Sequence, residues 1–239
     1  MQSGCQLQPP KPLKDIISGD SSMVKVYVAS IDSLLVDDYF KLKEKSVSQE
    51  RKKKMEACRM KKDKARSLAA GLLLQYAWNS DRKTTEKVEI SFGDNGKPVC
   101  SNDESFHFNL SHSGEFVACA VSEEIVGIDI QKEKTAELAI AKRFFMPEEY
   151  ETILRASKEE QARIFCKLWT AKESYMKYTG EGMSKRMNSF LVNMKDAFIY
   201  DEIDRIVIPV RWYTNIADYQ IAVCSLDREL VEEPIRVVL

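Results

Sequence analysis

Two short segments of this chain combine acidic and basic side chains in a way that suits phosphate chemistry. The segment Gly127-Ile128-Asp129-Ile130-Gln131 places Asp129 in an apolar, strand-like run. The segment Trp169-Thr170-Ala171-Lys172-Glu173-Ser174 places Glu173 on a predicted helix, beside Lys172 and one turn before Lys177. Mg²⁺ takes one or two protein carboxylates and fills its other positions with phosphate oxygens and water, while ammonium groups balance the remaining negative charge. These residues therefore predict a magnesium-dependent phosphate site.

Asp129 is unexpected at its position, because its neighbours Val126 and Ile128 are apolar. We interpret its carboxylate as a direct metal ligand; the structural alternative is a turn or helix cap before the next helix. Side chains alternate along a strand, so Gln131 points to the same face as Asp129. Its amide oxygen can coordinate weakly or through water, but it brings no charge.

Glu173 is separated from both Trp169 and Lys177 by four residues, which places all three along one face of a helix. The simplest alternative to a metal site is a surface Glu–Lys pair worth about 0.2–0.5 kcal/mol. For Trp169 we favour an anchor in the core or at an interface. Lys172 is less suited to the site, because its direction differs from that of Glu173 by about 100°.

A third segment, Phe108-Asn109-Leu110-Ser111-His112-Ser113, precedes the other two. The ordered set resembles the surfactin-type 4′-phosphopantetheinyl transferases over roughly residues 24–226. The resemblance implies an enzyme that transfers the 4′-phosphopantetheine arm of coenzyme A to a serine of an apo acyl, polyketide or peptidyl carrier protein. It also implies dependence on Mg²⁺ and release of adenosine 3′,5′-bisphosphate.

The resemblance also implies roles for individual residues. Asp129 and Glu173 would bind the metal, and Glu173 would be the base toward the serine hydroxyl. Lys177 would hold the pyrophosphate and the leaving group. Gln131 stands where relatives often have a third acid, which makes it a doubtful ligand and suggests a weaker metal affinity.

His112 lies between two serines, which invites comparison with a Ser–His catalytic pair. Neighbours in sequence rarely meet as nucleophile and base, and the chain has no GxSxG turn. In the family, an imidazole here would bind phosphate or transfer a proton, and Ser111 would contact phosphate through its hydroxyl. A structural histidine satisfied by the backbone remains the alternative.

The run Gly96-Lys97-Pro98 is not a phosphate-binding loop of the GxxxxGK[ST] type, because Ser91 and Pro98 break that pattern. It is better interpreted as part of a hairpin. By its position in the family, Lys97 and Pro98 would border the adenine of coenzyme A.

Three basic residues match family positions that hold the 3′-phosphate of coenzyme A: Arg51, Lys54 and Arg66. Arg66 matches best, because the surrounding Lys62-Asp63-Lys64-Ala65-Arg66-Ser67-Leu68 pattern also fits, and a guanidinium suits a phosphate monoester. The alignment of Arg51 and Lys54 can slip by one residue. Ala65 replaces a histidine that is frequent in relatives.

Residues 41–66 form a basic stretch with twelve Lys or Arg against four Asp or Glu, whereas the whole chain has a net charge of −1. Such a patch attracts phosphate or an acidic protein, although a solvated helix face is the simpler alternative. One rival function is therefore a nucleic-acid-binding protein. The sequence contains no recognisable nucleic-acid-binding motif, so we expect no nucleic-acid partner. The other rival is a relative that binds coenzyme A or carrier proteins without transfer.

The pattern of elements predicts an α/β fold of the α+β type. We expect a disordered or extended tail over residues 1–22, an N-terminal α/β half over 23–122 and a C-terminal half over 123–239. Each half is expected to follow a strand–helix–helix–strands order with a mixed, mostly antiparallel sheet. The halves would be related by a pseudo-twofold axis, with the site in the cleft between them. The core-facing stripe of the first half contains Ala65, Leu68, Ala69, Leu72, Leu73, Tyr76 and Ala77.

Composition narrows the setting of the protein. The chain has 239 residues, of which 44% are hydrophobic and 31% charged, as in soluble globular proteins. It contains no apolar run long enough for a membrane span and no secretion signal. Its six cysteines form no CxxC pair, and several lie in apolar runs. We therefore expect a cytoplasmic protein with free thiols, no membrane partner and, because both halves are on one chain, a monomer.

Overall fold

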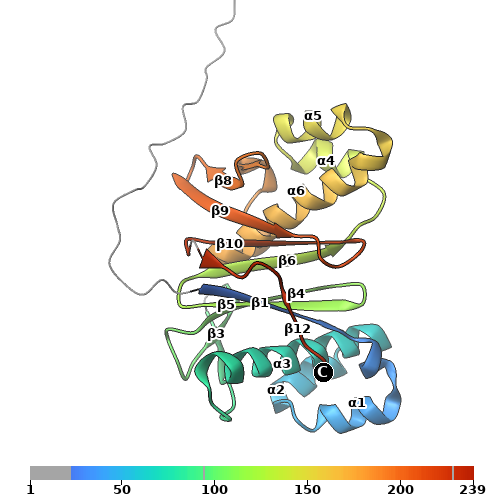
Figure 1. The fold of residues 1–239 in the computed structure, drawn as a ribbon, viewed down its shortest axis with the longest axis vertical. Coiled ribbons are helices and arrows are strands. Elements are labelled where there is room, and N and C mark those ends of the chain that lie inside the picture. The colour runs from blue at the N-terminus through green and yellow to red at the C-terminus, as the bar shows by residue number, and fades with distance from the viewer. Residues whose placement is uncertain (1–22, 94, 228) are drawn as a thin grey trace, which may run out of the picture.

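The computed structural model describes residues 23–93, 95–227 and 229–239; the tail expected for residues 1–22 lies outside them. Two central β-sheets are stacked against each other, and helices cover their outer faces (Figure 1). Three helices of the N-terminal part lie on one side of the stack, and three of the C-terminal part lie on the other. The prediction of an α/β class with two α/β parts is confirmed.

The first sheet contains the long strands of the N-terminal part, β1 (Met23–Ser30), β4 (His107–Ser113) and β5 (Phe116–Ser122). β5 pairs antiparallel with both of its neighbours. Along β5, Val117, Cys119 and Val121 face the core beneath the helices, whereas Ala118 and Ala120 face the second sheet. This is the alternation expected for a strand buried on both faces.

The helices of this part are α1 (Asp37–Glu44), α2 (Gln49–Glu56) and α3 (Lys61–Arg82), which follow a 3₁₀ turn, η1 (Asp32–Leu35). α2 begins at Ser48, whose hydroxyl accepts a hydrogen bond from the backbone N–H of Arg51 (3.2 Å). α3 packs on the sheet through most of the predicted stripe, but Tyr76 is 46% exposed. Its ring packs on that of Tyr27 in a T-shaped arrangement, while Trp78 is buried instead.

The second sheet is entirely antiparallel, in the order β6-β10-β9-β8-β7. Its strands are β6 (Val126–Lys132), β7 (Phe190–Asn193), β8 (Phe198–Asp201), β9 (Ile206–Tyr213) and β10 (Tyr219–Ser225). β8 was not expected from the sequence, because its four residues are too few to show a clear alternation. β6 lies at the edge of this sheet, and Val126, Ile128 and Ile130 face the first sheet.

Three helices cover the second sheet: α4 (Leu138–Phe144), α5 (Pro147–Arg155) and α6 (Lys158–Thr179). α5 begins at a proline, which suits the first turn of a helix because no N–H is lost there. The hydroxyl of Ser157 caps α6, and Gly180 ends it with a φ of 75°, in the left-handed region that favours glycine. The chain breaks between α4 and α5, at Phe145 and Met146, before Pro147 starts the second helix.

Short strands and two 3₁₀ turns complete the fold. β2 (Ile90–Phe92) and β3 (Pro98–Cys100) form the predicted hairpin. After α6, the chain makes two 3₁₀ turns, η2 (Gly182–Ser184) and η3 (Met187–Ser189). At the end of the chain, β11 (Glu229–Leu230) and β12 (Ile235–Arg236) pair with β1 of the first sheet. Residues 229–239 therefore contribute to the N-terminal sheet, although the sequence analysis grouped them with the C-terminal half.

Candidate functional site

α6 contacts β6 closely because Gly127 has no side chain. A Cβ at this position would lie 2.1 Å from the carbonyl oxygen of Ser174 and 2.6 Å from the backbone nitrogen of Tyr178. Real Cβ atoms do not come this close to backbone, so the strand–helix distance requires glycine. The contact lies two residues from Asp129 and on the stretch of α6 that carries Glu173 and Lys177.

Asp129 is the centre of a buried polar cluster with only 2% of its surface exposed. Its Oδ1 accepts hydrogen bonds from the Lys177 ammonium (2.7 Å) and from the Ser111 hydroxyl (2.6 Å). Lys177 also donates to the Ser111 oxygen (2.8 Å). Three predicted site residues, which come from β4, β6 and α6, thus meet at one point.

Glu173 lies on α6 one turn before Lys177 and is partly buried. Burial raises the pKa of its carboxyl group, the negative charge of Asp129 raises it further, and Lys177 lowers it. The charge of Asp129 thus acts on Glu173, and a cation beside the two acids would favour their ionised forms.

Gln131 lies on the same face of β6 as Asp129, as predicted. Its amide nitrogen donates to Asp129 Oδ2 (3.2 Å), and its amide oxygen accepts from Ser113 (3.3 Å). The amide oxygen is therefore turned away from Asp129. In this orientation, Gln131 contacts the carboxylate through its amide nitrogen, and its role as a metal ligand stays a prediction.

The two carboxylates suit Mg²⁺ better than a softer metal, because they offer only oxygen donors. Within the described ranges, no group of three or more His, Cys, Asp or Glu side chains could hold a metal ion. Two carboxylates are nevertheless the usual protein contribution to a Mg²⁺ site that shares the ion with substrate phosphates. The donor set fits such an ion and leaves most of its coordination to a ligand.

Ser111 belongs to a row of polar side chains that joins the two sheets. Asn109, Ser111 and Ser113 accept hydrogen bonds from the backbone N–H groups of Ile128 (2.9 Å), Ile130 (3.3 Å) and Lys132 (3.0 Å). These bonds satisfy the exposed edge of β6, which has no strand beyond it. Ser111 therefore has a structural role in addition to its contact with Asp129 and Lys177.

His112 points to the opposite side of β4 from Ser111, because side chains alternate along a strand. Burial by the surrounding protein, followed by the positive charges of Arg66 and Lys177, lowers its pKa below the usual 6.5, although the side chain remains accessible. The imidazole is therefore neutral near pH 7. A bound phosphate would reverse this effect and favour the protonated ring.

Arg66 is held at the first turns of α3. One terminal nitrogen donates to the carbonyl of Gly114 (2.8 Å), and the other pairs with Asp63. Its Nε is buried and has no hydrogen-bond partner among the described residues. The structure thus brings Arg66 and His112 to the same side of β4.

Lys97 and Pro98 line a hollow of about 260 Å³ together with Asn109, Lys177 and Gly180, which we call the Lys97 hollow. The Lys97 ammonium itself donates to the carbonyl of Tyr178 in the last turn of α6 (3.0 Å). Burial lowers its pKa. A cation at a helix C-terminus is stabilising, so Lys97 also fixes the hairpin against α6.

Arg51 and Lys54 lie on α2, and their contacts do not join them to Arg66. Arg51 packs on Gly71 of α3, where an added Cβ would be 3.2 Å from its Cγ and Nε. Lys54 lies over the ring of Phe92, 4.2 Å from its centroid, and forms a 3.7 Å pair with Glu50. Their role in binding coenzyme A stays a prediction.

Lys172 is a structural residue, as its predicted direction on the helix suggested. It is fully buried, pairs with Glu149 (2.9 Å) and donates to the carbonyls of Met187 and Phe190, both at 2.8 Å. Burial lowers its pKa and raises that of Glu149. Trp169 stacks with Phe165, which agrees with its interpretation as an anchor.

A second hollow of about 390 Å³ lies beside Glu173, and we call it the Glu173 hollow. Its lining is rich in methionine and aromatic side chains and includes Phe144, Trp169, Met176, Met183 and Met187. Arg143 and Arg186 add positive charge at its border. This hollow was not predicted, because its lining comes from three separate segments of the chain.

Gly127, Asn109 and Ser113 were not predicted as parts of the site. The signal was present for two of them, since Asn109, Ser111 and Ser113 alternate along one strand. Gly127 gave no such signal, because a glycine within an apolar run does not reveal which element approaches it.

The five cysteines within the described residues, Cys58, Cys100, Cys119, Cys166 and Cys224, are free, as expected, and Cys5 lies outside the described part. No helix in the part of the chain that the structure describes is long and apolar enough to cross a membrane.

Two family models match adjoining parts of the chain. The model described as 4′-phosphopantetheinyl transferase, N-terminal, matches residues 36–124. The model described as 4′-phosphopantetheinyl transferase superfamily matches residues 125–224. The second range contains Asp129, Glu173 and Lys177, and the first contains Arg66, Ser111 and His112.

Curated relatives agree with these matches. A 4′-phosphopantetheinyl transferase of Bacillus subtilis is 35% identical over 189 residues, which cover 75% of this chain and 82% of the relative. The 4′-phosphopantetheinyl transferase Sfp of Bacillus subtilis strain 168 is 34% identical, with 78% and 85% covered. The 4′-phosphopantetheinyl transferase gsp of Aneurinibacillus migulanus is 34% identical, with 69% and 70% covered.

Proposed function

The chain belongs to the 4′-phosphopantetheinyl transferase superfamily and is a transferase of that group, and we propose that it uses Mg²⁺ and coenzyme A to modify a carrier-protein serine. The observation that supports this most directly is the contact between Asp129 and Lys177, with Glu173 one turn before Lys177 on α6, where Gly127 brings β6 and α6 together. Two coupled carboxylates and one partly exposed ammonium suit a magnesium diphosphate.

Asp129 and Glu173 would hold Mg²⁺, which when bound neutralises phosphate charge and polarises the phosphoryl oxygens. The protein's own groups then align the substrates. Lys177 Nζ uses two hydrogen bonds on Ser111 and Asp129, so one of its three N–H groups is left for a phosphate oxygen. Ser111 and Gln131 keep Asp129 in one orientation.

In the proposed reaction, the serine oxygen of the carrier forms a bond to the phosphorus next to the pantetheine arm. The bond from this phosphorus to the bridging diphosphate oxygen breaks, and adenosine 3′,5′-bisphosphate leaves. The serine proton passes to Glu173, directly or through one water molecule. The raised pKa of Glu173 makes its carboxylate a stronger base than an exposed glutamate.

Arg66 and His112 would bind the nucleotide end of coenzyme A. The guanidinium is already oriented by Gly114, and the neutral imidazole lies on the same side of β4. A phosphate placed between them would raise the pKa of His112 and gain two charge-assisted hydrogen bonds. Lys97 and Pro98 would border the adenine from the hairpin.

The decisive experiment incubates the protein with Mg²⁺, coenzyme A and a panel of apo carrier proteins, and measures the intact mass of each carrier. We expect one carrier to gain the mass of a single phosphopantetheine arm, and its serine-to-alanine variant to gain none. Binding of coenzyme A or of a carrier without any mass gain would contradict the proposal.

The nucleotide contacts are tested separately with 3′-dephospho-coenzyme A. Loss of a hydrogen bond to a charged group costs about 1.5–3 kcal/mol, so Arg66→Ala should raise the KM for coenzyme A by about tenfold or more. The variant should lose the preference for coenzyme A over its dephospho form. An unchanged preference would remove Arg66 from the phosphate site.

We also propose that the protein works as a monomer in the cytoplasm. Both carboxylates of the site come from one chain, and the free thiols within the described residues suit a reducing compartment.

A further inference from the structure

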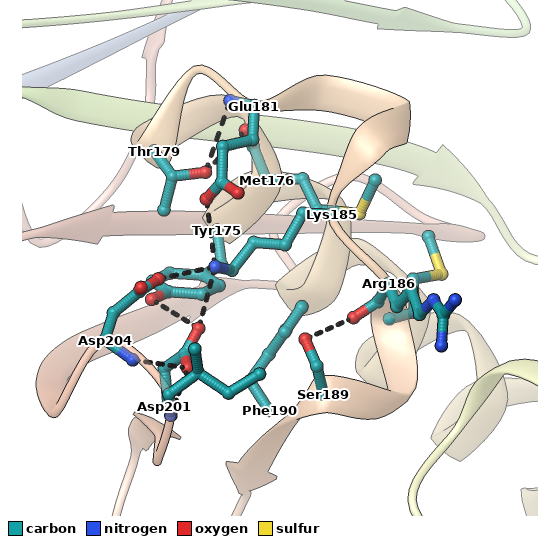
Figure 2. Close-up of polar contacts among 12 residues, drawn as sticks. Tyr175, Met176, Thr179, Glu181, Lys185, Arg186, Ser189, Phe190, Asp201 and Asp204 are labelled. Atoms are coloured by element: carbon teal, nitrogen blue, oxygen red, sulfur yellow. Dashed lines mark hydrogen bonds and ion pairs between the residues drawn. The ribbon is translucent and has the colours of Figure 1, made fainter.

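A second charged cluster, separate from the Asp129 site, lies at the end of α6 (Figure 2). Its centre is Lys185, whose ammonium pairs with Asp201 (2.9 Å), Asp204 (2.6 Å) and Glu181 (2.9 Å). All three N–H groups of the ammonium are engaged by carboxylates. This lysine therefore has no free donor for a ligand, and its role must lie in what it holds together.

The cluster is buried at its centre. The side chain of Lys185 is 6% exposed and that of Asp201 is fully buried. Asp201 also accepts hydrogen bonds from the Tyr175 hydroxyl (3.1 Å) and from the backbone N–H groups of Ile203 (3.0 Å) and Asp204 (3.2 Å). Burial alone would lower the pKa of Lys185, but hydrogen bonds to the three carboxylates raise it above the usual value.

Three parts of the chain are joined by these contacts. Glu181 and Lys185 belong to residues 180–189, which we call the post-helix segment. Asp201 ends β8, and Asp204 lies in the turn between β8 and β9. Tyr175 lies on α6, two residues after Glu173. The ion pairs thus fasten the middle of the post-helix segment to the second sheet, as Figure 2 shows.

The far end of the post-helix segment has its own attachment. The buried Lys172 donates to the carbonyls of Met187 and Phe190. Between Glu181 and Lys185, the segment carries Met183, which is 90% exposed. Because Met183 is exposed, its position depends on the ion pair between its neighbours Glu181 and Lys185 and not on packing of its own side chain.

The post-helix segment borders both hollows next to the Asp129 site. Gly180 and Gly182 line the Lys97 hollow, together with Lys177. Met183, Lys185, Arg186 and Met187 line the Glu173 hollow. A substrate whose phosphates lie at Lys177 and Glu173 must extend along one of these walls. The position of the segment therefore decides the shape of the space available to it.

We propose that Lys185 is a positioning residue for phosphopantetheine transfer, which acts by fastening the post-helix segment so that both hollows keep their shape. The proposal rests on the transfer reaction proposed above. Lys185 lies outside the reacting group of residues and acts through the segment. Its loss should therefore weaken substrate binding much more than the chemical step, because the wall contacts the bound substrate in the ground state and the transition state alike.

The test compares Lys185→Met, which keeps most of the length of the side chain but removes its charge, with the wild type. We expect the KM for coenzyme A to rise about tenfold, with kcat within a factor of two. Amide hydrogen exchange should become at least tenfold faster in residues 180–189 and stay unchanged in α3. This second readout does not depend on activity.

Three further variants make the result specific. Lys185→Arg keeps the charge and should restore most of the KM. Lys195→Met removes an exposed lysine from the turn between β7 and β8, where it forms no ion pair within the described structure, and should match the wild type. Asp204→Asn removes a partner that is 40% exposed and should give a smaller rise in KM, which preserves the test if Lys185→Met does not fold.

The outcomes separate this proposal from the proposed function. A wild-type protein that leaves every carrier unmodified contradicts the transfer reaction, whereas faster exchange in the Lys185→Met segment would still establish the fastening. An active Lys185→Met variant with a normal KM overturns the positioning role. The same holds for an Asp204→Asn variant that matches the wild type in KM and in exchange.

Discussion

Two lysines of α6, five residues apart, pair with carboxylates in very different surroundings. Lys172 and Glu149 are sealed, with side chains 0% and 2% exposed, whereas Lys177 is 27% exposed above the buried Asp129. The sealed ammonium uses its three donors on Glu149 and two carbonyl oxygens. Lys177 uses two donors on Ser111 and Asp129.

The free donor, and not the ion pair itself, distinguishes a lysine that can bind a ligand from a structural one. An ammonium group has three N–H bonds, and a fully satisfied one has nothing left for a ligand. Lys172 therefore stabilises one arrangement of α5, α6 and β7. Lys177 keeps one donor and an open side, which is the requirement for binding a phosphate.

The largest effect on transfer should separate the carboxylate partners of the two lysines, Asp129 and Glu149. Asp129→Asn should lower the rate of transfer by about 10³-fold, because it removes charge from the site where phosphate charge changes. Glu149→Gln, the same change at the sealed pair, should leave the rate per folded molecule close to normal. The measurement is kcat by carrier mass, with circular dichroism to establish folding. Equal losses of kcat in both variants would contradict the distinction between the Lys177–Asp129 pair and the sealed Lys172–Glu149 pair.

Lys172→Met should give the largest loss of stability, about 3–5 kcal/mol, because it leaves Glu149 buried without its counter-ion. Chemical denaturation measures the free energy of unfolding. The double variant Lys172→Met/Glu149→Gln should recover most of the loss, since neither partner then carries an unpaired charge. If the double variant is no more stable than Lys172→Met, the pair is not what holds this region together.

Glu173→Gln should stabilise the protein at neutral pH by on the order of 1 kcal/mol, while it abolishes transfer. Burial and the Asp129 charge raise the pKa of Glu173 in the folded state, so the folded protein binds its proton more tightly than the unfolded chain does. Stability of the wild type therefore falls as pH rises from the unfolded pKa, near 4.5, through the raised folded pKa.

The gain in stability of Glu173→Gln over the wild type should consequently be complete above the folded pKa of Glu173. It should vanish below about pH 4.5. Thermal melting over a pH series measures it, and the exposed Glu202→Gln on the turn after β8 is the matched control. A variant that is less stable than the wild type at pH 8 would contradict the predicted repulsion between Glu173 and Asp129.

The smallest effect is expected for Ser111→Ala. The hydroxyl links Lys177, Asp129 and the N–H of Ile130, but Asp129 keeps its contacts with Lys177 and Gln131. We expect a loss of about 1 kcal/mol in stability and a decrease in the transfer rate of less than tenfold. Steady-state kinetics and denaturation together check this. A 10³-fold loss would place Ser111 among the reacting groups.

The residues that meet at the site could be predicted where their chemistry conflicts with their local pattern. Asp129 is an acid in an apolar strand, and the spacing of Glu173 and Lys177 places them on one helix face, so all three were found from the sequence. The orientation of the Gln131 amide could not be found, because it depends on Ser113 from another strand. The long strands and helices followed from periodicity, whereas β8 and the return of β11 and β12 to β1 depend on contacts between distant segments.

The glycine at position 127 has a consequence for engineering. Because the close contact between β6 and α6 depends on the missing side chain at this position, attempts to alter substrate scope should leave Gly127 unchanged. A library that varies the walls of the two hollows can change which molecules enter, while the reactive centre keeps its dimensions. Conversely, transplanting the acids and the lysine onto another scaffold would reproduce the charges. It would not reproduce the close backbone contact between strand and helix that brings these residues together.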